Sequence, residues 1–205
     1  MRMRKKKHGA ERIAACSEYI IHDVNEIVNY PIELEIGCGK GSFILGMAKK
    51  YPDRSFIAIE RVSDVMLLAA EKIKAEGLNT IRFMRGDARE ILSLFPSGSV
   101  SRIYLNFSDP WPKKGYAKRR LTHRSFLALY KSVLTPSGQI HFKTDNEGLF
   151  DFSLEEFKES GFTLSELTRD LHHSIYNDDN IVTEYEQNFS TKGFPIHRVV
   201  ATLND

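Results

Sequence analysis

Short runs rich in β-branched and aromatic residues alternate along the chain with longer stretches whose apolar residues recur at helical spacing. Between Ser63 and Glu76, for example, apolar positions return every three or four residues, and Gly77 follows where a helix would end. The short runs predict strands at Ile32–Ile36, Ser55–Glu60, Thr80–Met84, Val100–Phe107 and Gln139–Lys143. The longer stretches predict helices through about Lys50, over Ser63–Glu76, near Arg89–Phe95, over Leu121–Leu134 and over Leu149–Ser160.

The last part of the chain has a different pattern. Glu184–Phe189 and Ile196–Leu203 both read as strands, without a clear helix between them, and Gly193 and Pro195 mark a turn. These two stretches therefore predict an antiparallel pair. The alternating β and α elements before them predict an α/β fold with a parallel sheet, covered by helices on both faces. Ligands of such sheets bind at the carboxyl ends of the strands, so the residues after each strand are the candidate site.

Composition limits the class of protein. The chain has 205 residues, of which 41% are hydrophobic and 11% aromatic, as expected for one globular domain. Its longest apolar run, Val65–Ala70, is far shorter than the ~20 residues of a membrane helix. The two cysteines, Cys16 and Cys38, lack the spacing of a disulfide scaffold or a zinc site. We expect no membrane association and no metal.

The N-terminus is basic, but no apolar segment follows it, which argues against a secretory signal. We therefore expect a cytoplasmic protein with a basic tail and leading helix over residues 1–31 and a single domain over residues 32–205. The sequence leaves open whether it is a monomer or a homodimer.

Charge is strongly segregated along the chain, although the net charge is only +2. Pro110–Thr144 contains eight Lys and Arg and no Asp or Glu, whereas Asp145–Asn188 contains twelve acids. Trp111, Tyr116 and Tyr130 lie within the basic stretch. Basic residues with aromatic neighbours suit a phosphate backbone and exposed bases, so nucleic acid is a candidate partner. A solvated helix face is the alternative explanation for such a charge run.

Acidic residues lie at the end of four predicted strands or just after them. Glu35 precedes a turn with Gly37, Gly39 and Gly41, and such a turn lets the backbone approach a ligand or pack closely against a helix. The other three acids are Glu60, Asp87 and Asp109. Glu60 lies 23 residues after Gly37, close to the offset at which nucleotide-binding folds place a carboxylate on a ribose. Asp87 fits a ligand or the cap of the next helix equally well.

The glycine spacing disfavours a dinucleotide. In the G-x-G-x-x-G pattern the third glycine would stand where this chain has Ser42. An acid directly before the turn favours a ligand with a cationic amino-acid end, and S-adenosylmethionine has one. A nicotinamide-dependent oxidoreductase and a non-catalytic RNA-binding protein remain the alternatives.

Several segments resemble bacterial tRNA (guanine-N7-)-methyltransferases, and the similarity runs over nearly the whole chain in the same order. The segments are Glu35–Gly41, Glu60, Tyr104–Lys114, Lys118–Arg120, His141–Asp145 and Thr183–Glu186. The resemblance implies a Rossmann-like class I methyltransferase fold, with a seven-stranded, mostly parallel sheet whose last strand is antiparallel. It also implies tRNA processing by methyl transfer from S-adenosyl-L-methionine to N7 of guanine 46 in the tRNA variable loop, which forms 7-methylguanosine.

The same resemblance assigns roles to individual residues. The cofactor site would contain Glu35, Gly37, Gly39, Gly41, Glu60, Asp87 and Asp109. The substrate would meet Lys113, Asp145, Thr183, Glu184, Tyr185 and Glu186, and RNA would contact Gly115, Tyr116, Ala117, Lys118, Arg119 and Arg120.

Guanine N7 carries a lone pair and no proton, so no general base is needed and positioning is expected to dominate catalysis. Asp109 is the candidate catalytic residue, because a carboxylate there would hold the base or stabilise the positive charge that develops on it. Trp111 would stack on the base or pack beneath the loop. Asp145 would contact the substrate or cap the following helix.

Overall fold

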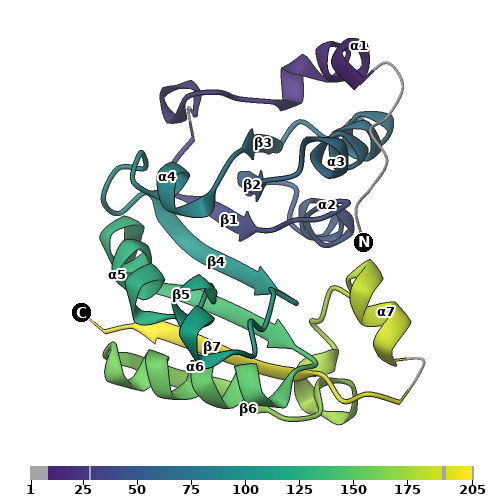
Figure 1. Cartoon of the computed structure of the whole chain (residues 1–205). Coiled ribbons are helices and arrows are strands. Elements are labelled where there is room, and N and C mark those ends of the chain that lie inside the picture. Colours follow the sequence, from purple (N-terminus) through teal and green to yellow (C-terminus); the bar gives the residue numbers. More distant parts are fainter. Residues whose placement is uncertain (1–8, 28, 191–192, 205) are drawn as a thin grey trace.

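The protein forms a seven-stranded sheet in the order β3-β2-β1-β4-β5-β7-β6, in a computed structural model that describes residues 9–27, 29–190 and 193–204 (Figure 1). The strands are β1 (Ile32–Ile36), β2 (Phe56–Glu60), β3 (Ile81–Arg85), β4 (Val100–Asn106), β5 (Leu134–Thr144), β6 (Phe162–Thr168) and β7 (His197–Leu203). β1 to β5 pair in parallel, while β7 runs antiparallel to both β5 and β6. The predicted sheet with its antiparallel last strand is confirmed.

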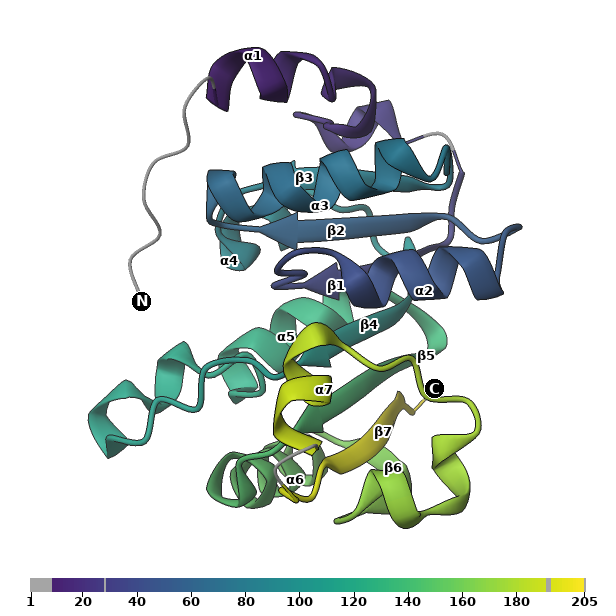
Figure 2. The ribbon, with the colours of Figure 1, turned by 90° about the vertical axis from the view of Figure 1, so that its right-hand side faces the viewer.

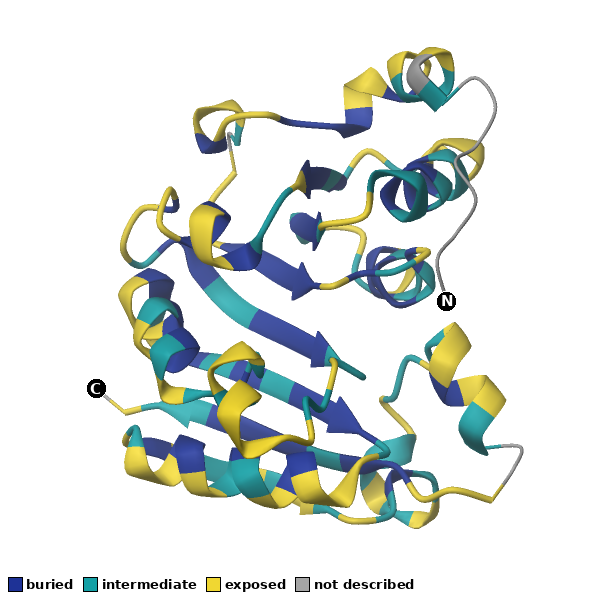
Figure 3. Ribbon diagram, in the orientation of Figure 1, coloured by how far each residue is buried: buried dark blue, intermediate teal, exposed yellow. Residues whose placement is uncertain are grey.

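Helices cover both faces of the sheet (Figures 1 and 2). They are α1 (Gly9–Ala14), α2 (Ser42–Lys50), α3 (Ser63–Ala75), α4 (Ala88–Leu92), α5 (Arg124–Val133), α6 (Glu147–Glu159) and α7 (Glu184–Ser190). Alternate residues of one strand serve the two sides. In β2, Phe56 and Ala58 pack with α2 and α3, while Ile57 and Ile59 pack with the cluster that includes α4, α5 and α6. This two-sided burial explains why β2 is a continuous apolar run up to its last residue, Glu60 (Figure 3).

One predicted strand is wrong. Glu184–Phe189 lies in the helix α7, and the antiparallel neighbours of β7 are β5 and the unpredicted β6. The reason is a capping box at Thr183 and Glu186. The Thr183 hydroxyl accepts from the Glu186 backbone N–H at 2.9 Å, and the Glu186 carboxylate accepts from the Thr183 N–H at 3.3 Å. This pair satisfies two backbone donors at the start of a helix and so favours helix over strand.

Two predicted boundaries also shift. α5 begins at Arg124 rather than Leu121, because the His123 imidazole accepts from the Ser125 N–H at 3.1 Å and caps the helix there. β5 begins at Leu134, ahead of the predicted Gln139, and its pairing with β4 is irregular at that end.

The segment before β1 packs against the β3 edge of the sheet. Cys16, Tyr19 and Ile20 are buried in the same cluster as α3, and Ile20 forms a parallel bridge with Phe83. The basic residues Arg2, Arg4, Lys5, Lys6 and Lys7 lie outside the described residues. In the described part of the chain, no helix combines the length and the apolar character that a membrane crossing requires.

Candidate active site

Two adjoining hollows lie at the carboxyl ends of the parallel strands. The larger, of about 720 Å³, is lined by the ends of β2, β3 and β4 and includes Glu60, Asp87 and Asp109. The smaller, of about 320 Å³, lies between the glycine turn and α7 and includes Glu35. Gly37, Asn106 and Phe107 line both. The fold thus gathers the four acidic strand ends around one continuous site, in the size range of small-molecule pockets.

The three glycines of the turn have different surroundings. Gly37, Gly39 and Gly41 have φ of 79°, 56° and 75°, in the left-handed region that side chains disfavour. A Cβ at Gly37 or Gly39 would meet nothing within 4 Å, so these two face open space in the hollows. A Cβ at Gly41 would lie 2.8 Å from that of Ala69. Gly41 therefore allows α2 to start against α3, and it is not among the described residues that line the two hollows.

Glu35 is the most unusual group in the site. Glu35 is the penultimate residue of β1, and it is only 2% exposed. Asn106 Nδ2 donates to Oε1 at 3.1 Å, while Oε2 is buried and finds no hydrogen-bond partner among the described residues. Burial raises the pKa of Glu35 to about 7. A buried carboxylate oxygen without a partner is costly, and a cationic ligand group would relieve that cost.

Glu60 and Asp87 are held by backbone amides. Glu60 accepts from Gly39 N–H at 3.1 Å and from Val62 N–H at 2.8 Å, which fixes the glycine turn against the end of β2. Asp87 accepts from Arg89 N–H at 2.9 Å and caps α4. The capping interpretation of Asp87 is therefore confirmed, and its carboxylate also lines the larger hollow.

Asp109 lies on a loop whose backbone is held in an uncommon conformation. Phe107 and Trp111, on either side of it, have φ of 52° and 42°. Left-handed backbone at non-glycine residues costs free energy and is concentrated at functional loops. Arg120 braces this loop, since its guanidinium donates to the carbonyls of Pro110 at 3.0 Å and Trp111 at 3.1 Å. Arg120 therefore supports the Asp109 loop from within, although we predicted it to contact RNA.

The rest of the basic segment forms a 3₁₀ turn, Lys114–Arg119, at the rim of the larger hollow. Gly115, Tyr116 and Lys118 are exposed, as is Lys113 just before the turn, and Ala117 is half-buried. Arg119 lies over the rings of Trp111 and Tyr116, with its Cζ 4.9 and 4.5 Å from their centroids. Trp111 is half-buried and lines the hollow.

α7 closes the smaller hollow and is fixed to the glycine turn through Glu184. The Glu184 carboxylate accepts from Lys72 at 2.9 Å, Lys40 at 3.0 Å and Ser42 at 2.8 Å. The hydrogen bond from Lys72 is the main reason that the pKa of Glu184 is lowered to about 2. Thr183, Glu184 and Tyr185 line the hollow. The predicted substrate segment therefore lies at the site, although the carboxylate of Glu184 is occupied by protein groups.

Glu186 points away from the hollow into the protein. It is fully buried and accepts from Lys143 at 2.8 Å and Asn180 at 2.6 Å, and it pairs with His172 at 2.9 Å. Burial raises the pKa of Glu186, but the charge and hydrogen bond of Lys143 outweigh it, so this pKa lies below its ordinary value. Lys143 in turn ends β5. The pair anchors α7 to the sheet, a role that the sequence analysis did not assign to Lys143.

Asp145 and Lys113 are not among the described residues that line the two hollows. The Asp145 carboxylate accepts from the Tyr185 hydroxyl at 3.4 Å. Its alternative role as a helix cap is wrong, because Asn146 caps α6 by accepting from Leu149 N–H at 2.8 Å. The described residues contain no group of three His, Cys, Asp or Glu side chains that could hold a metal ion.

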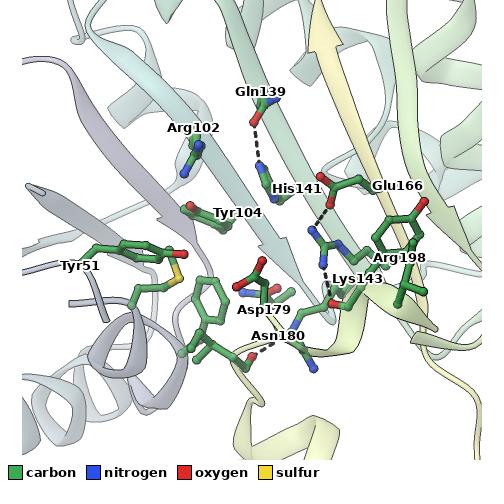
Figure 4. Close-up of a pocket in the computed structure, with 16 residues that line it drawn as sticks. Tyr51, Arg102, Tyr104, Gln139, His141, Lys143, Glu166, Asp179, Asn180 and Arg198 are labelled. Atoms are coloured by element: carbon green, nitrogen blue, oxygen red, sulfur yellow. Dashed lines mark hydrogen bonds and ion pairs between the residues drawn. The ribbon is translucent and has the colours of Figure 1, made fainter. Parts of the chain in front are cut away.

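A third hollow of about 350 Å³ lies behind the site, between α2, the polar face of β4 and β5, and the segment before α7 (Figure 4). Its polar groups mostly bind one another. Arg198 pairs with Glu166, Lys143 donates to Asn180 Oδ1 at 2.8 Å, and His141 lies 3.1 Å from Gln139. Burial lowers the pKa of His141 to about 3. Lys143, which lines this hollow, also holds α7 through Glu186.

The fold and the site together define a class I methyltransferase. The defining features of this class are the strand order with an antiparallel β7 and the glycine turn that follows β1 and its Glu35. The fold is similar to that of an antibiotic-related methyltransferase of known structure, with a TM-score of 0.61 and 14% identity, over 99% of this chain and 97% of that one.

Sequence comparison narrows the class to a family. Residues 29–199 match the family model Methyltransf_4, described as "Putative methyltransferase". The chain is 47% identical to the tRNA (guanine-N(7)-)-methyltransferase of Lachnoclostridium phytofermentans, over 94% of each chain. It is 45% identical to the enzyme of that name from Geobacillus kaustophilus, over 98% of this chain and 96% of the relative. The chain belongs to the tRNA (guanine-N7)-methyltransferase family.

Proposed function

We infer that this enzyme transfers a methyl group from S-adenosyl-L-methionine to N7 of a guanine in tRNA, and we propose guanine 46 of the variable loop as the target. The observation that carries the proposal is the buried, unpartnered Oε2 of Glu35, in a hollow that continues into one edged by Lys118 and Arg119. The Glu35 carboxylate suits a cationic cofactor, and Lys118 and Arg119 suit a phosphate backbone.

The chain offers a partner for each polar part of the cofactor. Glu35 would accept from the ammonium group, Glu60 from the ribose hydroxyls and Asp87 from the adenine amino group. Gly37 and Gly39 leave open space where backbone and ligand can approach closely. When bound, the cofactor supplies an electrophilic methyl group on a sulfonium.

The chain's own contribution to the reaction is to position the base and stabilise charge. Guanine N7 is nucleophilic without losing a proton, so no side chain has to act as a base. We propose that Asp109 accepts from guanine N1–H and the 2-amino group and stabilises the positive charge that develops on the purine. The loop bonds from Arg120 keep the carboxylate in place, which suits a reaction governed by positioning.

The basic turn supplies the RNA contact. We propose that Lys113, Lys118 and Arg119 bind tRNA phosphates, with Gly115 and Ala117 allowing close approach of the backbone. We propose that the enzyme acts in the cytoplasm, where its tRNA substrate is found. The proposal is the same for a monomer and for a homodimer.

The test is methyl transfer to unmodified tRNA with labelled S-adenosyl-L-methionine, followed by aniline-sensitive cleavage to locate the modified base. We expect a single cleavage at guanine 46, and loss of about 10²-fold or more in kcat for Asp109→Ala. Asp53→Ala, at an exposed acid outside the site, is the matched control and should retain activity. Stabilisation by S-adenosylhomocysteine and not by NAD would separate this function from a nicotinamide-dependent reaction. Label elsewhere in the tRNA, or a fully active Asp109→Ala, contradicts the proposal.

A further inference from the structure

Four aromatic rings form a continuous series from the smaller hollow to the protein surface. Phe107 and Tyr185, which line the hollow, have ring centroids 5.0 Å apart. Tyr185 stacks on Phe189 at 4.2 Å, and Phe189 contacts Phe194 at 6.0 Å. The rings come from the end of β4, from α7 and from the segment before β7. We call Phe107, Tyr185, Phe189 and Phe194 the aromatic series.

Two of the four residues are too exposed for a cluster that serves only to pack α7. Phe194 is 53% exposed and Tyr185 is 43% exposed, although aromatic rings stabilise a protein most when they are buried. The anchoring of α7 is already supplied by the Glu184 and Glu186 carboxylates. The exposed faces therefore remain available to a partner.

The charges around the aromatic series select the chemistry of that partner. Asp145 accepts from the Tyr185 hydroxyl, and the nearby cations Lys40 and Lys72 are paired with Glu184. The two lysines and two carboxylates on this side of the site balance in charge, so it offers phosphate no net attraction, whereas the turn that carries Lys118 and Arg119 does. Planar, uncharged groups suit the aromatic series, and unstacked nucleobases are such groups.

We propose that the aromatic series is a stacking site for a nucleobase next to the target guanine. This proposal rests on the proposed function, because a guanine drawn into the hollow must leave its stack and expose its neighbours. The phosphate backbone then lies on the Lys118 side and the flanking base on the Phe194 side. The series thus determines how the variable loop opens around the enzyme.

Steady-state kinetics with tRNA test the proposal. Phe194→Leu keeps an apolar side chain but removes the stacking face, and it should raise KM for tRNA about 5- to 10-fold with kcat and KM for the cofactor unchanged. Phe194→Trp should restore KM to the wild-type value or below. Ile175→Ser, at an apolar residue that is 83% exposed and outside the series, is the control and should leave KM unchanged. A lowered Tm with altered kcat and unchanged KM for tRNA would show that the ring only braces α7 and would overturn the proposal.

A binding measurement separates this proposal from the proposed function. Two tRNAs are prepared with the fluorescent base 2-aminopurine, one with the probe immediately before the target guanine and one with it immediately after. Each tRNA is titrated with enzyme in the presence of S-adenosylhomocysteine, and the fluorescence of the probe is measured. Neighbouring bases already quench the probe in free tRNA, so quenching is compared between the two complexes. We expect one probe to be less fluorescent when bound to the wild type than when bound to Phe194→Leu. Quenching without methyl transfer in the activity assay would refute only the function. Methyl transfer with neither probe quenched, or with quenching equal in wild type and Phe194→Leu, would refute only the stacking site.

Discussion

Replacement of Glu35 by Gln should change how the stability of the cofactor-free protein depends on pH. The folded protein raises the pKa of this carboxyl from 4.5 to about 7, because the group is buried. Between these pH values the unfolded chain has lost a proton that the folded protein keeps, so stability falls as pH rises through about 7. At about 1.4 kcal/mol per tenfold change in proton affinity, the loss amounts to about 3 kcal/mol.

Urea unfolding of wild type and Glu35→Gln at pH 5 and pH 8.5 measures this loss. The amide retains an oxygen for Asn106 Nδ2 and cannot ionise, while every other titrating group is common to both proteins. We expect the stability of the variant relative to wild type to increase by about 2 to 3 kcal/mol between the two pH values. The reasoning fails if the difference between the two proteins is the same at both.

Ligand binding provides an independent measurement. At pH 7 about half of the Glu35 side chains in the free enzyme carry a proton. An ammonium group placed against Oε2 would ionise them, so S-adenosylhomocysteine binding should release about half a proton. Calorimetry in two buffers of different ionisation enthalpy detects this release, and it should vanish in Glu35→Gln.

Three further predictions concern the groups around α7 and the basic turn. Lys143→Met should lower the free energy of unfolding by about 3 to 5 kcal/mol, because it leaves the fully buried Glu186 uncompensated, and Lys143→Met combined with Glu186→Leu should recover much of this in urea unfolding. Glu184→Gln should cost less than about 1 kcal/mol, since the ion pairs are partly exposed, but should raise KM for the cofactor because the glycine turn loses its tie to α7; an unchanged KM argues against that tie. Arg119→Gln should reduce the slope of log KM for tRNA against log salt by about one, and an unaltered slope would mean that Arg119 makes no phosphate contact.

The sequence was sufficient to place the parallel half of the sheet and the acidic ends of its strands. The strands there are short runs rich in β-branched and aromatic residues between clear helices. The topology brings their carboxyl ends together, so Glu35, Glu60, Asp87 and Asp109 could be grouped without coordinates. The last quarter of the chain was harder. Thr183 to Glu186 carries the spacing of a capping box, but the aromatic residues beside it also suit a strand, and the resulting error hid β6 as the partner of β7.

Individual side-chain roles were less predictable than their location. Glu186 and Arg120 lie close to the site in sequence and space, yet both turn inward, one to Lys143 and the other to the Asp109 loop. A charged residue near a site can bind a ligand or support the backbone that does, and residue type and spacing are the same in both cases. The deciding information is the identity of the groups across the fold, such as Lys143 on β5, which the local pattern does not contain.

The carboxylate that begins α7 has a consequence for the order in which the enzyme is completed. A seven-residue helix is too short to persist alone in water, so α7 needs Lys143 on β5, Lys40 in the glycine turn and Lys72 on α3 already in place. We therefore expect α7, which closes the smaller hollow, to form late, after the central strands have joined. We expect a partly folded chain to expose the basic turn at Lys114–Arg119 before α7 has formed. Such a chain would bind RNA before it can modify it.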